Sequence, residues 1–338
     1  PLVNLPADAV DAEKHDVHSW LDIGANFLTV VSFRTPPRPN RPTRPPYHDS
    51  IRRCLGLIGF NTSNCEWATC RMKVFAHRGV TDRHPGNSLA AIDRALARGH
   101  SVEVDVRSTA DGVFVLSHDE HVRTADGGCV DVAETALADL YDRAETGPYG
   151  EDAYPTLERV LSRFAGEHAP DAELAMHLKE SRDGLEMALR DLVASVDDRF
   201  DATDLFESVF VFDASMASAR RFADCAPRLR VGLSVGDDEF APDERHPTVY
   251  AYDQVRSLDF EIVWADEWLG SLYSEAFVDR CRADGRTVIC ISPELHRNTT
   301  PMHPDADAYA SRWPSLATIG VDGICTDHPN ELEDFMHD

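Results

Sequence analysis

The chain has 338 residues, of which 43% are hydrophobic, and this is enough for an extensive core in one large domain or two ordinary ones. Its formal net charge of −26 argues against nucleic acid or an anionic membrane surface as a partner, because both bind to basic surfaces. No apolar run approaches the roughly 18 residues of a membrane-spanning helix, so we expect no stable membrane insertion.

The cations are almost all arginines. Only Lys14, Lys73 and Lys179 are lysines, whereas carboxylates are abundant. Such a surface is typical of halophilic proteins, which stay hydrated in concentrated salt because screening weakens the repulsion between like charges. GC-rich coding bias is the alternative explanation. The eight cysteines include no C-x-x-C pair, so we expect them to be reduced and structural in a cytoplasmic protein.

The first 71 residues differ from the rest in composition. They carry 8 Arg or Lys against 7 Asp or Glu, whereas the remainder carries 25 against 52. A proline-rich stretch, residues 34–46, cannot form a helix or a central strand. We expect residues 1–71 to be an irregular extension without a catalytic role. The change at Met72 favours sequence from upstream of the native protein over a flexible segment that binds a partner.

From residue 73 onward, short β-branched apolar runs alternate with helical patterns. Near-continuous apolar strands of this kind indicate a parallel sheet covered by helices. Eight such units match a (β/α)8 TIM barrel, in the class of α/β folds. The alternative, a doubly wound sheet, would carry a Gly-rich phosphate loop after its first strand, and this chain does not. The expected strands are residues 74–77, 102–106, 173–179, 208–213, 230–235, 260–266, 287–292 and 322–327. The expected helices include residues 88–99, 156–166, 184–196, 215–225, 273–285 and 307–320.

Polar side chains finish most of these strands. The active site of a TIM barrel lies at the C-terminal ends of its strands, so these side chains are expected to converge on one face. They are His77, Arg78, Glu103, Asp105, His177, Lys179, Asp213, Asp266, Glu294 and Asp327.

Glu103 and Asp105 are two residues apart on one expected strand, so both carboxylates point to the same side. Two carboxylates facing the barrel interior repel each other unless a cation lies between them or one is protonated. A divalent cation such as Mg²⁺ or Ca²⁺ with oxygen ligands would resolve this repulsion. The alternative is a salt-bridged pair that faces the helices.

His177 and Lys179 have the same spacing on the third expected strand. Lys179 is the only lysine after Lys73, and burying an ammonium group is costly unless anions compensate for it. A bound phosphate and the two carboxylates would compensate. A lysine at the edge of the strand that extends into solvent is the alternative.

Two histidines complete the set. His77 ends the first expected strand, and His118 follows an apolar run after the Asp111-Gly112 turn. One histidine would relay the proton of a nucleophile while the other protonates the leaving oxygen. A metal ion, Arg78 and Lys179 would stabilise charge on phosphoryl oxygens, so the set suits an anionic ester.

In this order, the motifs resemble the glycerophosphodiester phosphodiesterase family. The matching elements are HRG (77–79), P-x-N (85–87), VEVDVRSTADG (102–112), SHD (117–119), HLK (177–179) and GVDGICTDHP (320–329). The resemblance covers about residues 73–338 and implies a barrel that hydrolyses phosphodiesters with a divalent cation. It implies further that His77 and His118 are the acid/base pair and that residues 120–155 are the family's small insertion. It implies metal ligands at Glu103 and Asp105, and phosphate contacts at Arg78 and Lys179.

The chain departs from the family at two positions, which indicates a divergent branch. The first loop has Gly86 where the family has Glu, and the third strand has His177 where the family has a third carboxylate ligand. As a metal ligand, His177 would suit Mn²⁺, Zn²⁺ or Fe²⁺ better than Ca²⁺. Otherwise it would contact the substrate and leave two carboxylates and waters on Mg²⁺.

Glu294 and His296 follow the seventh expected strand and are expected on the same face. There they would supply a missing carboxylate or bind polar groups of the substrate. The alternatives are a helix cap for Glu294 and a surface position for His296.

We therefore expect a metal-dependent enzyme that hydrolyses a small glycerophosphodiester-like molecule to an alcohol and a phosphomonoester. Two alternatives stay open: a lyase that forms a cyclic phosphate, and a barrel that binds phosphodiesters without turnover. The sequence makes no prediction about the oligomeric state or the alcohol that is released.

Overall fold

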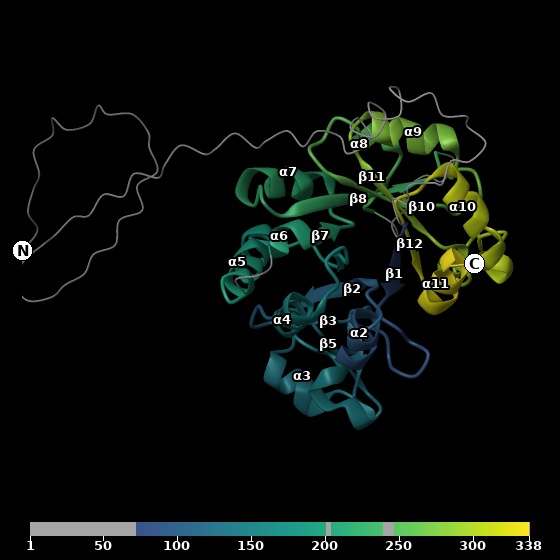
Figure 1. The fold of residues 1–338 in the computed structure, drawn as a ribbon. Helices are drawn as coiled ribbons and strands as arrows, with labels where there is room; N and C mark the ends of the chain where they lie inside the picture. The colour runs from purple at the N-terminus through teal and green to yellow at the C-terminus, as the bar shows by residue number, and fades with distance from the viewer. Residues whose placement is uncertain (1–71, 201–203, 239–246, 338) are drawn as a thin grey trace, which may run out of the picture. The chain divides into compact units, whose positions relative to one another are not determined.

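The computed structural model describes residues 72–200, 204–238 and 247–337, and Figure 1 shows their arrangement. The expectations for residues 1–71 lie outside the described residues.

Eight parallel strands form a closed barrel. Neighbouring strands pair in parallel around the ring, and β1 closes it by pairing with both β2 and β12. The barrel strands are β1 (Lys73–His77), β2 (Ser101–Ser108), β6 (Leu174–Leu178), β7 (Val209–Phe212), β8 (Arg230–Gly236), β10 (Ile262–Asp266), β11 (Thr287–Ile291) and β12 (Gly323–Thr326). A short strand, β9 (Val249–Tyr250), pairs with β8. All eight expected strands and the TIM barrel are confirmed.

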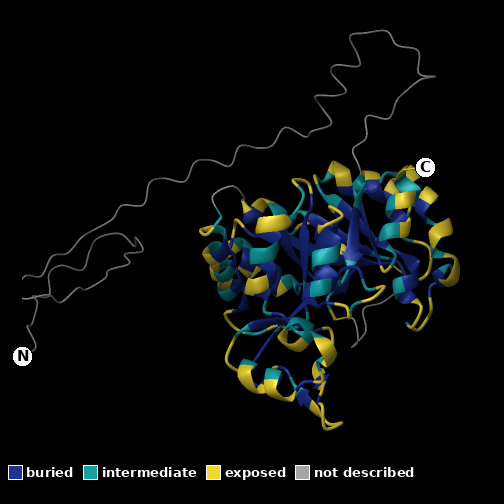
Figure 2. Cartoon of the chain, turned by 60° about the horizontal axis from the view of Figure 1, so that its bottom comes forward, coloured by how far each residue is buried: buried dark blue, intermediate teal, exposed yellow. Residues whose placement is uncertain are grey.

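Helices surround the barrel, and Figure 2 shows their exposed outer faces around the buried strands. They are α2 (Leu89–Leu96), α4 (Leu157–Glu167), α5 (Leu185–Asp197), α6 (Leu205–Ser208), α7 (Met216–Cys225), α8 (Tyr252–Val255), α9 (Glu275–Ala283), α10 (Trp313–Ile319) and α11 (Pro329–His337). Two 3₁₀ helices, η3 (Pro293–His296) and η4 (Ala306–Ser311), follow β11. In the described residues, no helix is both long enough and apolar enough to cross a membrane.

One expected helix is wrong as a single element. The segment predicted as one helix over residues 307–320 is the 3₁₀ helix η4 followed by α10. Pro314 lies in the first turn of α10, where its missing N–H leaves no intrahelical bond unmade. In the middle of a continuous helix, the same proline would remove a hydrogen bond and clash with the preceding turn.

The insertion between β2 and α4 has its own small core. Strand β3 (Phe114–Leu116) runs antiparallel to β2, and β4 (His121–Arg123) pairs with β5 (Cys129–Asp131) in a hairpin. Helix α3 (Leu137–Arg143) and the 3₁₀ helix η2 (Gly147–Ala153) complete it. Its core is Val115, Val122, Val130, Val132, Leu140 and Ala144. The insertion expected over residues 120–155 is therefore an ordered part of the structure.

Aromatic side chains fill the barrel interior beneath its C-terminal rim. Phe75 lies edge-on to Phe210 and Trp264, with ring centroids 6.1 and 5.8 Å apart. Trp264 also stacks on Phe212 at 4.0 Å. This packed layer gives the polar strand ends above it a rigid floor.

Replacing Phe75 by Ala is expected to lower the free energy of unfolding by about 3–5 kcal/mol, because the fully buried ring leaves a cavity in the barrel. Urea unfolding followed by circular dichroism measures the loss. The control is Met187→Ala on α5, where the side chain is 49% exposed and the change should stay within about 0.5 kcal/mol. Equal losses in the two variants would contradict the packing described for this layer.

Candidate active site

A cavity of about 790 Å³ opens at the C-terminal ends of the barrel strands. Seven of the nine side chains assigned to the site from the sequence line it: His77, Arg78, Glu103, His118, His177, Lys179 and His296. Asp105 lies fully buried beneath them. The structure therefore brings most of the expected groups to one space.

The carboxylates of Glu103 and Asp105 lie side by side on β2 and are 1% and 0% exposed. Arg78 Nε is 2.9 Å from Asp105 Oδ2, and Lys179 Nζ is 3.1 Å from Asp105 Oδ1. Burial raises the pKa of Asp105, but Lys179, His177 and Arg78 together outweigh burial and hold it well below its usual range. Asp105 is therefore ionised at neutral pH.

Asn87 fixes the position of Asp105. Its side-chain amide donates to Asp105 Oδ2 at 2.8 Å, and its Oδ1 accepts from the Asp105 backbone N–H at 3.0 Å. Asn87 has φ +64°, a left-handed conformation that asparagine adopts more readily than most residues. The P-x-N motif thus ends the first loop on a direct contact with the β2 carboxylate.

His177 lies beside Asp105 because β2 and β6 pair in register at these two residues. Its Nδ1 is 3.3 Å from Asp105 Oδ1 and 3.5 Å from Glu103 Oε1, and its Nε2 is 3.1 Å from Asp213 Oδ2. Burial and Lys179 lower the pKa of His177, but the three carboxylates outweigh them and raise it to about 10. Asp213 has the opposite response: burial raises its pKa, but His177 more than offsets this and lowers it to about 2.

Two oxygens of this cluster fit a metal ion. Glu103 Oε1 and Asp105 Oδ1 are buried and accept no hydrogen bond in suitable geometry, although cationic nitrogens lie close to them. Together with a nitrogen of His177 they lie within 4.8 Å of one another. Two buried carboxylate oxygens and one imidazole nitrogen are a donor set that a divalent cation can accept.

His77 and His118 reach the cavity from different elements. His77 ends β1, and its Nδ1 is 2.7 Å from Asp327 Oδ1, at the end of β12, which leaves Nε2 for the cavity. His118 follows β3, so it comes from the insertion and not from a barrel strand, and its Nδ1 is 2.7 Å from Asp119. Burial lowers the pKa of His118, which favours its neutral form at pH 7.

Close backbone contacts in the first loop explain why glycine occupies positions 79 and 86. Gly79 has φ +86°, and a Cβ there would lie 2.5 Å from a backbone atom of Ala91 on α2. A Cβ at Gly86 would lie 3.1 Å from the Arg78 side chain. Gly86 therefore lets the loop fold closely over Arg78, which is turned toward Asp105.

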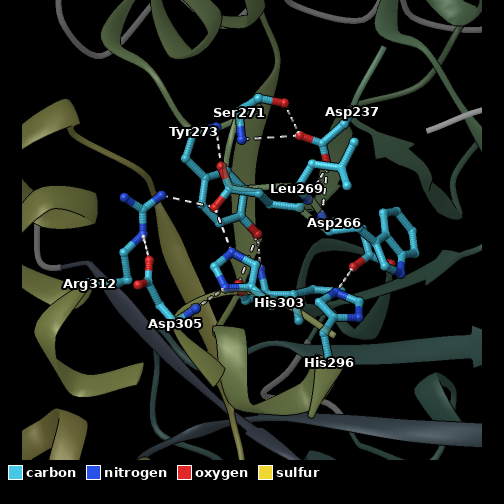
Figure 3. A network of polar contacts seen from close by, with 12 residues as sticks. Asp237, Asp266, Leu269, Ser271, Tyr273, His296, His303, Asp305 and Arg312 are labelled. Atoms are coloured by element: carbon cyan, nitrogen blue, oxygen red, sulfur yellow. Dashed lines mark hydrogen bonds and ion pairs between the residues drawn. The ribbon is translucent and has the colours of Figure 1, made fainter. Parts of the chain in front are cut away.

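Glu294 and His296 have different surroundings although both lie on η3. The structure does not bring Glu294 to the cavity wall: its carboxylate accepts hydrogen bonds from the hydroxyls of Ser292 and Thr326 and from the Asp327 backbone. His296 lines the cavity, and its Nε2 hydrogen-bonds to Asp266 at the end of β10 (Figure 3). Burial lowers the pKa of His296, but Asp266 outweighs burial and raises it.

Two buried carboxylates hold the segment after β10, and sequence reasoning gave them no role. Asp237 accepts from the backbone N–H groups of Trp268 and Leu269 at 2.6 and 3.2 Å (Figure 3). Glu267 lies 3.0 Å from His303 and 2.9 Å from Arg312. These contacts fix the loop that carries Asp266 and Trp268 into the cavity wall. In the sequence, Asp266 and Glu267 stand next to each other at the end of an expected strand. Nothing in the sequence shows that Asp266 lines the cavity while Glu267 contacts His303 and Arg312.

The barrel and its site define the class: the chain is a TIM-barrel phosphoric diester hydrolase. Residues 77–331 match the glycerophosphoryl diester phosphodiesterase family, and the chain belongs to this family. The resemblance that the sequence motifs carry is thus confirmed.

Individual relatives agree with the family match. The Bacillus subtilis protein YqiK is 33% identical over 277 residues, which cover 78% of this chain and 98% of YqiK. The Bacillus subtilis glycerophosphodiester phosphodiesterase is 30% identical over 136 residues, which cover 34% of this chain and 46% of that relative. The second alignment thus spans less than half of its relative.

Solved structures share the fold. A phosphodiesterase from Oleispira antarctica, solved with the product sn-glycerol-3-phosphate, has 21% identity and a TM-score of 0.56, and the match covers 79% of this chain and 97% of that one. A glycerophosphodiester phosphodiesterase from Parabacteroides distasonis has 23% identity and a TM-score of 0.55 with the same coverage. At these identities the likeness concerns the fold.

Replacing Asn87 by Gly is expected to lower the free energy of unfolding by about 1–3 kcal/mol, because the Asp105 carboxylate and backbone N–H lose their hydrogen bonds to the Asn87 amide. Glycine accepts the positive φ, so the loss reports on the hydrogen bonds rather than on strain. Denaturant unfolding measures it, with Asn330→Gly in the first turn of α11 as a control that includes both the effect of glycine on the unfolded chain and its cost in a helix. A smaller loss at Asn87 than at Asn330 would refute the role given to the amide.

Proposed function

We propose that the protein hydrolyses a glycerophosphodiester-like substrate to an alcohol and a phosphomonoester, with a divalent cation and with His77 and His118 as the acid/base pair. The observation that carries the proposal is the convergence of two histidines, two cations and the carboxylate of Glu103 around one cavity, with the carboxylate of Asp105 directly beneath them. The product named for the Oleispira antarctica phosphodiesterase, sn-glycerol-3-phosphate, supports a glycerophosphate half in the substrate.

Glu103, Asp105 and His177 would hold the metal ion. When bound, the ion would supply positive charge to the phosphoryl oxygens and so stabilise the transition state. Mg²⁺ and Ca²⁺ suit the two carboxylates, and Mn²⁺, Zn²⁺ or Fe²⁺ suit a set that includes the His177 imidazole.

The cationic side chains and the histidines would perform the remaining steps. Arg78 and Lys179 would bind the phosphoryl oxygens of the substrate and balance their negative charge. Of His77 and His118, one would take a proton from the nucleophile and the other would give a proton to the leaving alcohol oxygen. Asp327 would hold the His77 ring with Nε2 toward the substrate.

His296, held by Asp266, would contact polar groups of the alcohol half. Glu294 would act by positioning the end of β12 through Thr326.

Composition adds a proposal about the cellular environment. The cysteines in the described part of the chain, five in number, are free, which is what a reducing cytoplasm would maintain. With few lysines and abundant carboxylates, the surface suits a salt-rich cytoplasm.

His77→Gln and His118→Gln are each expected to lower kcat by about 10²–10⁴-fold on an alkyl phosphodiester, because each variant loses one proton transfer. With a p-nitrophenyl diester, whose leaving group needs no proton, the variant that lacks the acid should recover most of its activity and the other should not. Steady-state kinetics on both substrates measures this. His168→Gln, at the end of α4 and outside the cavity, is the control.

Full activity in both variants would refute the acid/base pair. Phosphorus NMR of the products separates two of the alternatives, since a hydrolase releases a monoester and a lyase accumulates a cyclic phosphate. A wild-type protein that binds diesters but converts none with any divalent cation would instead be a binding barrel.

Removal of divalent cations with a chelator is expected to abolish turnover, and a divalent cation added back should restore it, because the positive charge that the ion would supply to the phosphoryl oxygens is then missing. Glu103→Gln should weaken metal binding measured by calorimetry. Asp253→Asn, exposed on α8, should leave it unchanged. Unaltered turnover in a metal-free preparation would contradict metal dependence.

A further inference from the structure

Asp213 lies at the end of β7, on the far side of His177 from the two β2 carboxylates. Its Oδ2 is 3.1 Å from His177 Nε2, and the hydroxyls of Ser234 and Thr248 also hydrogen-bond its carboxylate. It has φ +61°, a conformation that non-glycine residues adopt rarely. The backbone is thus turned so that this carboxylate meets the imidazole.

The His177 ring is held on three sides. Its Nδ1 edge faces Glu103 and Asp105, and its Nε2 edge faces Asp213. The ring also packs on Phe212, with centroids 4.6 Å apart, and Phe212 in turn stacks on Trp264. Few orientations of the imidazole are compatible with all three contacts.

Asp213 does not belong to the donor cluster itself. Within the ranges that the structure describes, the cluster that could hold an ion here consists of Glu103, Asp105 and His177. The imidazole ring lies between Asp213 and the other two carboxylates, so Asp213 would not ligate an ion there, and its hydrogen bond to His177 is the contact through which it would position the site.

We propose that Asp213 is a positioning residue for metal binding: by accepting the Nε2–H of His177, it holds the ring so that Nδ1, once a metal ion displaces its proton, completes a site with Glu103 and Asp105. A ligating histidine that donates its other N–H to a carboxylate is better oriented and more basic as a ligand. The resulting set of two carboxylates and one imidazole selects Mn²⁺, Co²⁺ or Zn²⁺ over Ca²⁺. This inference rests on the metal site of the proposed function. It adds that His177, held by Asp213, determines which ion the site prefers.

The test is metal binding by the full-length protein, stripped with a chelator, with Zn²⁺, Mn²⁺ and Ca²⁺ titrated by calorimetry and Co²⁺ followed by its visible absorption. The wild type should bind Zn²⁺ and Mn²⁺ more tightly than Ca²⁺. Asp213→Ala should weaken Zn²⁺ and Mn²⁺ binding by about 10–100-fold and alter the Co²⁺ spectrum. Asp213→Asn, which keeps an acceptor oxygen but no charge, should have a smaller effect. The matched control is Asp266→Asn, a strand-end carboxylate that hydrogen-bonds to His296 in the same cavity and should leave metal affinity unchanged.

Repeating the Asp213 substitution in a His177→Glu variant separates an effect through the position of His177 from a general effect of the Asp213 charge on the metal ion. His177→Glu should shift the preference toward Ca²⁺, and in that background Asp213→Ala should no longer weaken metal binding. Wild-type affinity in Asp213→Ala, or an equal loss in both backgrounds, would overturn the inference. Circular dichroism confirms folding, and Asp213→Asn keeps the test valid if Asp213→Ala does not fold.

Activity of the same preparations reports separately on the proposed function. If the protein is active and metal-dependent but Asp213→Ala binds metal as tightly as the wild type, this inference is overturned and the proposed function is not. A chain inactive with every cation would overturn the proposed hydrolysis, while metal affinity could still depend on Asp213.

Discussion

Glu103 and Asp105 are both almost completely buried at the mouth of the barrel, on the same side of the same strand. Two carboxylates in this position repel each other and lose their hydration, and each effect opposes folding unless cations are close. Arg78, after β1, and Lys179, after β6, supply two of these cations, and His177 on β6 pairs in register with Asp105. The barrel topology makes this possible because β1, β2 and β6 are neighbours.

The burial of these two carboxylates leaves two of their oxygens able to accept a further hydrogen bond or to bind a metal ion. Glu103 Oε1 and Asp105 Oδ1 accept no hydrogen bond in suitable geometry, although nitrogens of His177 and Lys179 lie close to them. On the side of the barrel interior, His177 packs on Phe212, which stacks on Trp264. An ion and an anionic substrate in the cavity above would complete the cluster.

The barrel and much of the site could be predicted because both depend on local patterns. Apolar β-branched runs mark the strands, and a parallel barrel brings the residues after each run to one rim. The spacing of Glu103 and Asp105 gives their shared direction without any knowledge of the neighbouring strands. Glu294 shows the limit of this reasoning: it lies on the expected loop, but Ser292 and Thr326 draw its carboxylate away from the cavity.

Other features depend on contacts between distant segments, which a pattern along one segment does not contain. The sequence shows Asp213 as a polar strand end but does not show its partner, because the contact needs a positive φ and the neighbouring β6 strand. The sequence also predicts His118 in the site, but only the fold shows that it comes from an antiparallel strand of the insertion. Residues 307–320 form two helices because Pro314 lies in the first turn of α10, and the pattern along the sequence does not show which turn the proline occupies.

Anomalous scattering from a crystal of this protein soaked in Mn²⁺ locates the metal site most directly. One strong peak is expected about 2.1 Å from Glu103 Oε1, Asp105 Oδ1 and His177 Nδ1. A peak that involves neither carboxylate of β2, or no peak at the barrel mouth, would contradict it.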